Sequence, residues 1–104
     1  MSTKFAFDVA IWHPGRSSCA AEVRQHFVDL DTKRPYTGND GLLNLWLQDP
    51  GLPTFRWYAT VPPNGDECLF LFCYDRGERA ERILSANGHL WPDNAVFVAF
   101  RQAQ

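Results

Sequence analysis

The chain has 104 residues, of which 45% are hydrophobic and 21% are charged. These proportions predict one globular domain and exclude a disordered or low-complexity chain. Twelve acidic and ten basic residues give a formal net charge of −2. This balance argues against a dedicated nucleic-acid-binding protein, because such proteins carry a basic surface.

The first segment with a clear pattern, residues 4–12, alternates as a strand does. One face carries the bulky residues Phe5, Phe7, Val9 and Ile11, and the other carries Ala6, Asp8, Ala10 and Trp12. We expect helices to cover the bulky face. The sequence His13-Pro14-Gly15 then predicts a turn that ends the strand.

Two helices are predicted after this turn. The first covers residues 18–31, with Ser17 or Ser18 as its cap and with apolar residues at helical spacing, namely Ala20, Val23, Phe27 and Leu30. The second is short, residues 41–48, with Asp40 as its cap and Pro50 beyond its end. It is apolar on nearly all sides, so it is either buried or docks a partner.

The second half of the chain predicts three strands and one helix. Strands are expected at 55–61, at 68–74 and at 95–101, and a turn at 62–66 joins the first two as a hairpin. A helix is expected at 77–88, where Glu78 and Arg82 form an i,i+4 pair and Gly88 suits the position after the helix.

The predicted order is therefore β-α-α-β-β-α-β in a single α+β domain covering residues 1–104. Without the short second helix, this is the split βαβ order of ferredoxin-like folds. We accordingly predict a four-stranded, mostly antiparallel sheet with the helices on one face. In that topology the first and third strands are central, and the second and fourth form the edges.

The cysteines Cys19, Cys68 and Cys73 do not suggest a disulfide framework, because they are odd in number and have no paired spacing. No metal site is expected, since zinc-ligand spacing is missing, and no motif for a cofactor is present. The N-terminal residues lack the apolar core of a signal peptide, and no apolar run is long enough to cross a bilayer. We expect a reduced, cytoplasmic protein.

The predicted topology gathers several loops at one rim of the sheet. A rim with aromatic residues and mixed charges suits a protein interface, and it could also form a small catalytic cleft. The alternative is that His13 and Trp91 cap the core while the charges are solvated. The residues at this rim are Trp12, His13, Arg16, Asp75, Arg76, Trp91 and Asp93.

The sequence contains partial signals for two further functions, thiol catalysis and RNA binding. Cys19 lies near the start of the first helix, where the helix dipole favours a thiolate, but His26 is two turns away, roughly 10 Å by the helical rise, too far to act as its base. Phe70, Phe72 and Tyr74 alternate as in the stacking platform of an RNA-recognition module. The basic signature of that module is absent, so we expect nucleic acid to be an unlikely partner. Because Cys19 has no base within reach along its helix, we also expect the protein not to be an enzyme.

The opening Phe7-Asp8-Val9-Ala10-Ile11-Trp12, in a compact α+β chain, resembles small bacterial proteins that accompany toxins. More broadly, the chain is similar to immunity proteins of contact-dependent growth inhibition and other polymorphic toxin systems. The resemblance implies a small, cytoplasmic, non-enzymatic protein that neutralises a toxin, such as a nuclease, by covering its active site. The acidic groups Asp66, Glu67, Asp75 and Asp93 would then meet the basic groove of the toxin, and Trp12 or Trp91 would anchor the contact.

Overall fold

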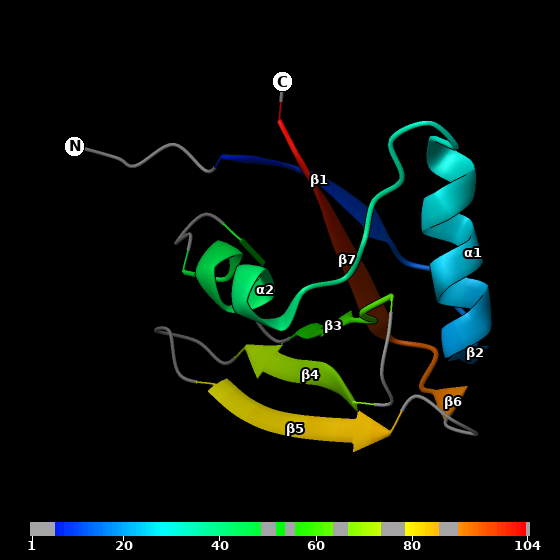
Figure 1. Cartoon of the computed structure of the whole chain (residues 1–104). Helices are drawn as coiled ribbons and strands as arrows, with labels where there is room; N and C mark the ends of the chain where they lie inside the picture. The colour runs from blue at the N-terminus through cyan, green and yellow to red at the C-terminus, as the bar shows by residue number, and fades with distance from the viewer. Residues whose placement is uncertain are drawn as a thin grey trace.

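The computed structural model describes residues 6–48, 52–53, 56–63, 67–73, 79–85 and 90–103, with only the backbone path given for 67–73, 79–85 and 90. The domain is α+β, as predicted (Figure 1). No described helix is long and apolar enough to cross a membrane. The elements are β1 (Phe7–Trp12), β2 (Ser18–Cys19), α1 (Ala20–Leu30), α2 (Asp40–Trp46), β3 (Arg56–Thr60), β4 (Glu67–Cys73), β5 (Arg79–Ser85), β6 (Leu90–Trp91) and β7 (Ala95–Gln102).

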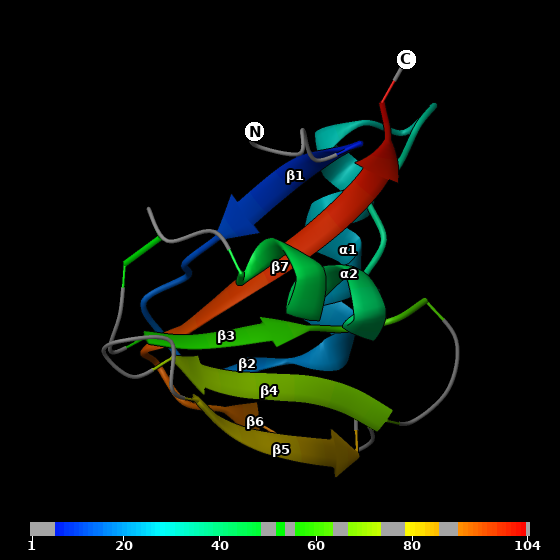
Figure 2. The same ribbon diagram turned by 90° about the vertical axis from the view of Figure 1, so that its left-hand side faces the viewer.

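The main sheet has five strands in the order β1-β7-β3-β4-β5, and β2 and β6 form a separate small sheet. Strand β7 is antiparallel to β1 and parallel to β3, whereas β3, β4 and β5 form an antiparallel meander (Figure 2). The predicted ferredoxin-like order placed the first strand in the centre. Instead, β1 is the outermost strand, and β7 lies between it and β3.

The helix predicted at 77–88 is wrong for its described part, because Arg79–Ser85 is strand β5. This segment pairs with all seven residues of β4. An i,i+4 charge pair contributes only about 0.2–0.5 kcal/mol, and a short helix without packing is marginal in water. The backbone hydrogen bonds to β4 therefore decide the conformation.

The two helices lie on opposite faces of the main sheet, which corrects the prediction of helices on one face (Figure 1). Strand β7 is buried on both faces, and this explains its nearly continuous apolar sequence. The cluster under α1 contains Ala20, Val23, Phe27, Ala59, Val61, Trp91, Ala95, Phe97 and Ala99. The cluster under α2 contains Leu43, Tyr58, Val98 and Phe100, with Phe7 and Val9 packed against it.

The caps of both helices differ from prediction. The Oγ of Ser18 donates to the carbonyl of Arg16, and Cys19 occupies the N-cap of α1 without a side-chain cap hydrogen bond. In α2 the N-cap is Asn39, whose side chain accepts from the backbone N–H of Leu42 at 2.9 Å. The predicted cap, Asp40, is the first helical residue instead.

One side of α2 packs on the sheet, and the rest of the helix is partly or fully exposed. Leu43 is fully buried, and Trp46 packs edge-to-face on Tyr58 at a centroid distance of 5.7 Å. Leu45 is 51% exposed. On α1, Leu30 is also 51% exposed, although the sequence placed it on the buried face. It is the last residue of the helix, beyond the turns that pack on the sheet.

Candidate functional site

The predicted site residues that the structure describes lie in different environments. Trp12 is half-buried, whereas His13 and Asp93 are exposed. Glu67 is the first residue of β4, where only the backbone is described. Asp66, Asp75 and Arg76 lie outside the described residues.

Trp91 is wrong as a surface anchor, because its side chain is fully buried. Strand β6 pairs with β2, which places Trp91 opposite Ser18. Its indole packs edge-to-face on Phe97 at 5.6 Å, within the cluster under α1. The alternative considered for this residue, a cap on the core, fits its position.

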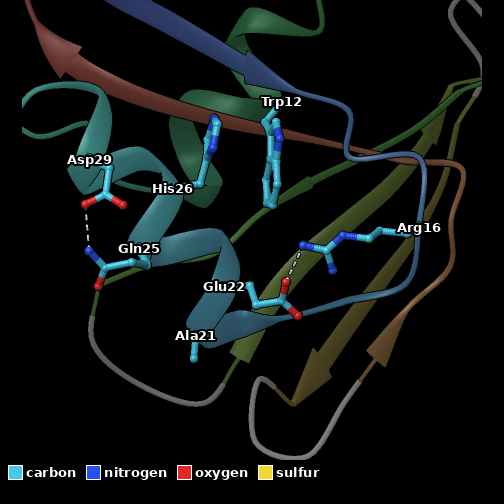
Figure 3. A pocket seen from close by; sticks show the side chains of 7 residues that line it. All are labelled: Trp12, Arg16, Ala21, Glu22, Gln25, His26 and Asp29. Atoms are coloured by element: carbon cyan, nitrogen blue, oxygen red, sulfur yellow. Dashed lines mark hydrogen bonds and ion pairs between the residues drawn. The ribbon is translucent and has the colours of Figure 1, made fainter.

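A shallow groove of about 470 Å³ lies between the end of β1 and the outer side of α1 (Figure 3). It combines aromatic rings with charges of both signs. We call it the α1 groove, and its lining residues are Trp12, Arg16, Ala21, Glu22, Gln25, His26 and Asp29.

The centre of the α1 groove is a stacked pair of rings, Trp12 from β1 and His26 from α1. Their centroids are 4.1 Å apart and their planes differ by 8°. The ring centroid of Trp12 also lies 6.0 Å from that of the buried Phe97. The ring of His26 is nearly perpendicular to that of Phe27, with a centroid distance of 5.3 Å. Both rings thus also contact aromatic rings of the core.

Partial burial lowers the pKa of His26 below its ordinary value, and the nearby carboxylate of Asp29 opposes this shift. Because the ordinary value is 6.5, the imidazole is mostly neutral at pH 7. The centre of the groove is therefore aromatic and carries no added positive charge.

Charged groups flank the stacked pair. Arg16 and Glu22 form an ion pair of 2.6 Å, which lowers the pKa of the carboxyl and raises that of the guanidinium. Gln25 donates from Nε2 to Oδ1 of Asp29 at 2.7 Å. With the imidazole neutral, two carboxylates and one guanidinium give the lining a formal charge of −1.

The thiol of Cys19 lies beside the carboxylate of Glu22. Its Sγ donates to Oε1 of Glu22 at 3.7 Å, and the imidazole of His26 stacks on Trp12 instead. Within the described ranges, no group of three or more His, Cys, Asp or Glu side chains is placed to hold a metal ion.

Comparison with known proteins gives no relative from which a role could be transferred: no family model, no curated protein and no solved structure matches the chain.

Sequence reasoning identified Trp12 and Arg16 but missed the contribution of α1 to this surface. The polar residues Glu22, Gln25, His26 and Asp29 recur at spacings of three and four, which places them on one side of a helix. This pattern is equally typical of a solvated face. Only the position of Trp12 beside α1 distinguishes the two, and it depends on the tertiary fold.

Proposed function

We propose that this protein is a non-catalytic, cytoplasmic protein-binding domain and that the α1 groove is its recognition surface. The observation that carries the proposal is the stacked pair of Trp12 and His26, which is ordered by the core and flanked by charged side chains. Aromatic residues with a polar surround are typical of the centres of protein interfaces. Ordering before binding also reduces the entropy lost on association.

The shape of the α1 groove favours a protein partner over a small molecule. Pockets for small ligands usually bury most of the ligand surface. This groove is open and shallow, and its charges come from α1 and from Arg16 on the link that precedes it (Figure 3). A convex feature of another protein can cover such a surface, whereas a small ligand would remain mostly in water.

The main alternative, an RNA-binding sheet face, receives less support. It requires an open face, but α1 and α2 cover opposite faces of β7 and β3. The side chains of Phe70, Phe72 and Tyr74 lie outside the description. The net charge of −2 also opposes binding to phosphates.

The partner that we propose is a bacterial toxin domain, such as a nuclease, which the protein would neutralise by covering its active site. Two features support this choice: the resemblance of the segment Phe7–Trp12 to immunity proteins, and the excess of acidic residues. That segment forms β1 and delivers Trp12 to the α1 groove. An acidic inhibitor would approach a basic active site faster, because opposite charges steer the encounter.

The test begins with capture of partners from native host lysate by the tagged protein and by two groove variants, His26→Ala and Asp29→Lys. Leu45→Ala is the matched control, because Leu45 is exposed on α2, which covers the opposite face of the sheet. Each variant is first checked for an unchanged thermal midpoint. A captured protein is then purified, and its nuclease activity is titrated with the wild-type domain.

The proposal predicts one stoichiometric partner that is lost with both groove variants and kept with Leu45→Ala. Removal of a central interface residue weakens binding by about 2 kcal/mol, or roughly 30-fold. The nuclease activity of the partner should fall to zero at one equivalent. Capture that is equal for all variants would overturn the assignment of the groove, and recovery of RNA alone, lost as salt rises, would favour the sheet-face alternative.

A further inference from the structure

We infer that the α1 groove accepts an arginine side chain of the partner, with its guanidinium stacked on the outer face of His26 and paired with the carboxylate of Asp29. This inference rests on the proposed function, because it names the chemical group that the recognition surface binds. It commits to a cationic, planar group on a partner protein.

The order of the side chains along the groove provides the geometry. In Figure 3 the rings of Trp12 and His26 lie side by side, and Asp29 lies on the side of His26 away from Trp12. One face of the imidazole is occupied by Trp12 at 4.1 Å. The opposite face is directed towards the side where Asp29 lies. A flat group placed there would form a third layer of the stack and would lie near the carboxylate.

The charges of the groove favour a cation at this position. Arg16 is already paired with Glu22, so the guanidinium and that carboxylate largely cancel. Asp29 accepts a hydrogen bond from Gln25 at Oδ1, which leaves the carboxylate with its negative charge and with Oδ2 available to a further donor. The neutral imidazole of His26 does not repel an incoming cation.

Arginine fits this arrangement better than lysine. A guanidinium is planar and weakly hydrated, so it can stack on a ring while its edge donates to a carboxylate. Cations also gain from contact with aromatic faces, and arginine does so more often than lysine. Arginine is moreover one of the residues that carry most of the energy in protein interfaces. An acidic side chain would instead meet the uncompensated carboxylate of Asp29.

The test uses a blocked tripeptide, acetyl-Gly-Arg-Gly-amide, titrated into the full chain and followed by the NMR signals of the Trp12 indole and the His26 imidazole. The same peptide with citrulline in place of arginine is the control, because citrulline has nearly the same shape without the charge. Asp29→Asn is compared with Asp8→Asn, which makes the same change of charge on β1, at a carboxylate that is 44% exposed and does not line the groove.

We expect saturable shifts of both rings with the arginine peptide and none with the citrulline peptide. Loss of one exposed ion pair should weaken binding about fivefold in Asp29→Asn, whereas Asp8→Asn should bind as the wild type does. Equal shifts with both peptides, or no shift with either, would overturn the inference. If the peptide fails but the groove variants still lose the captured partner, only the arginine assignment falls. If both experiments fail, the proposed function falls with it.

Discussion

Substitution of Gly38 by alanine gives the sharpest test of the fold, because the link between α1 and α2 approaches β3 very closely there. A Cβ atom at this position would lie 2.1 Å from the carbonyl oxygen of Val61 and 2.7 Å from Oγ1 of Thr60. Real Cβ atoms essentially never come within 3.0 Å of such atoms. Because backbone occupies the space, the link itself must move away.

That movement would break hydrogen bonds on both sides of Gly38. Thr37 exchanges two backbone hydrogen bonds of 2.8 Å with Phe100, and the N–H of Asn39 donates to Oγ1 of Thr60 at 3.0 Å. At about 1 kcal/mol for each of the three hydrogen bonds, together with a strain of about 1 kcal/mol, the loss in unfolding free energy is roughly 4 kcal/mol. For a domain of this size, the thermal midpoint should fall by roughly 16–32 °C.

Urea unfolding followed by tryptophan fluorescence measures this loss directly. Gly41→Ala is the matched control, because its Cβ would lie 3.4 Å from Oδ1 of Asn39 and its position is helical. Alanine favours a helix over glycine by up to about 1 kcal/mol, so the control should be neutral or stabilising. A Gly38→Ala protein within about 0.5 kcal/mol of the wild type, the scatter of ordinary surface substitutions, would refute the described path of this link.

Four further outcomes follow from the structure. Thr60→Val should lower the unfolding free energy by about 2 kcal/mol, because the buried hydroxyl bonds to two backbone groups, whereas Thr60→Ser should retain most of it. Trp91→Ala should cost about 3–5 kcal/mol in urea unfolding as a core cavity, and any folded fraction should bind the partner normally. The pKa of Asp31 is lowered, mainly by hydrogen bonds from the backbone N–H groups of Arg34 and Lys33. The ionised carboxylate therefore stabilises the fold above the ordinary pKa of 3.8, and this stabilisation is lost as pH falls through the lowered pKa. Acid titration of Asp31→Asn should lack this loss. The pKa of His26 is also lowered, so the native state should lose stability as pH falls from 6.5 through the lowered value, and the difference between wild type and His26→Gln in thermal midpoint should show this interval.

Local patterns in the sequence were sufficient to predict most of the elements. The alternation in 4–12 and in 55–61 predicts strands that the structure contains as β1 and β3. The helical spacing of Ala20, Val23 and Phe27 predicts α1, and all three are buried. In each case, burial of one face of a regular element is a short-range property that periodicity records.

The arrangement of these elements could not be predicted, because it depends on contacts between distant segments. The alternation of β1 does not show which distant side chains cover each of its faces. Phe97 and Val98 of β7, about 85 residues later in the chain, lie in separate clusters on the two faces of the sheet. The groove was missed for the same reason. Trp12 and His26 are far apart in sequence, and only the register of β1 on β7 brings the indole to α1.

The central place of β7 has a consequence for how the protein is made. Ribosomal synthesis delivers β1, α1 and α2 well before β7, yet both core clusters contain residues of β7. The pairing of β1 with β7 closes loops of 85 to 95 positions, and contacts of such long range make folding slow. Until β7 emerges, the apolar sides of β1, α1 and α2 remain exposed to other nascent chains. The interval before β7 is complete is thus when this chain is most prone to aggregate and most in need of chaperones.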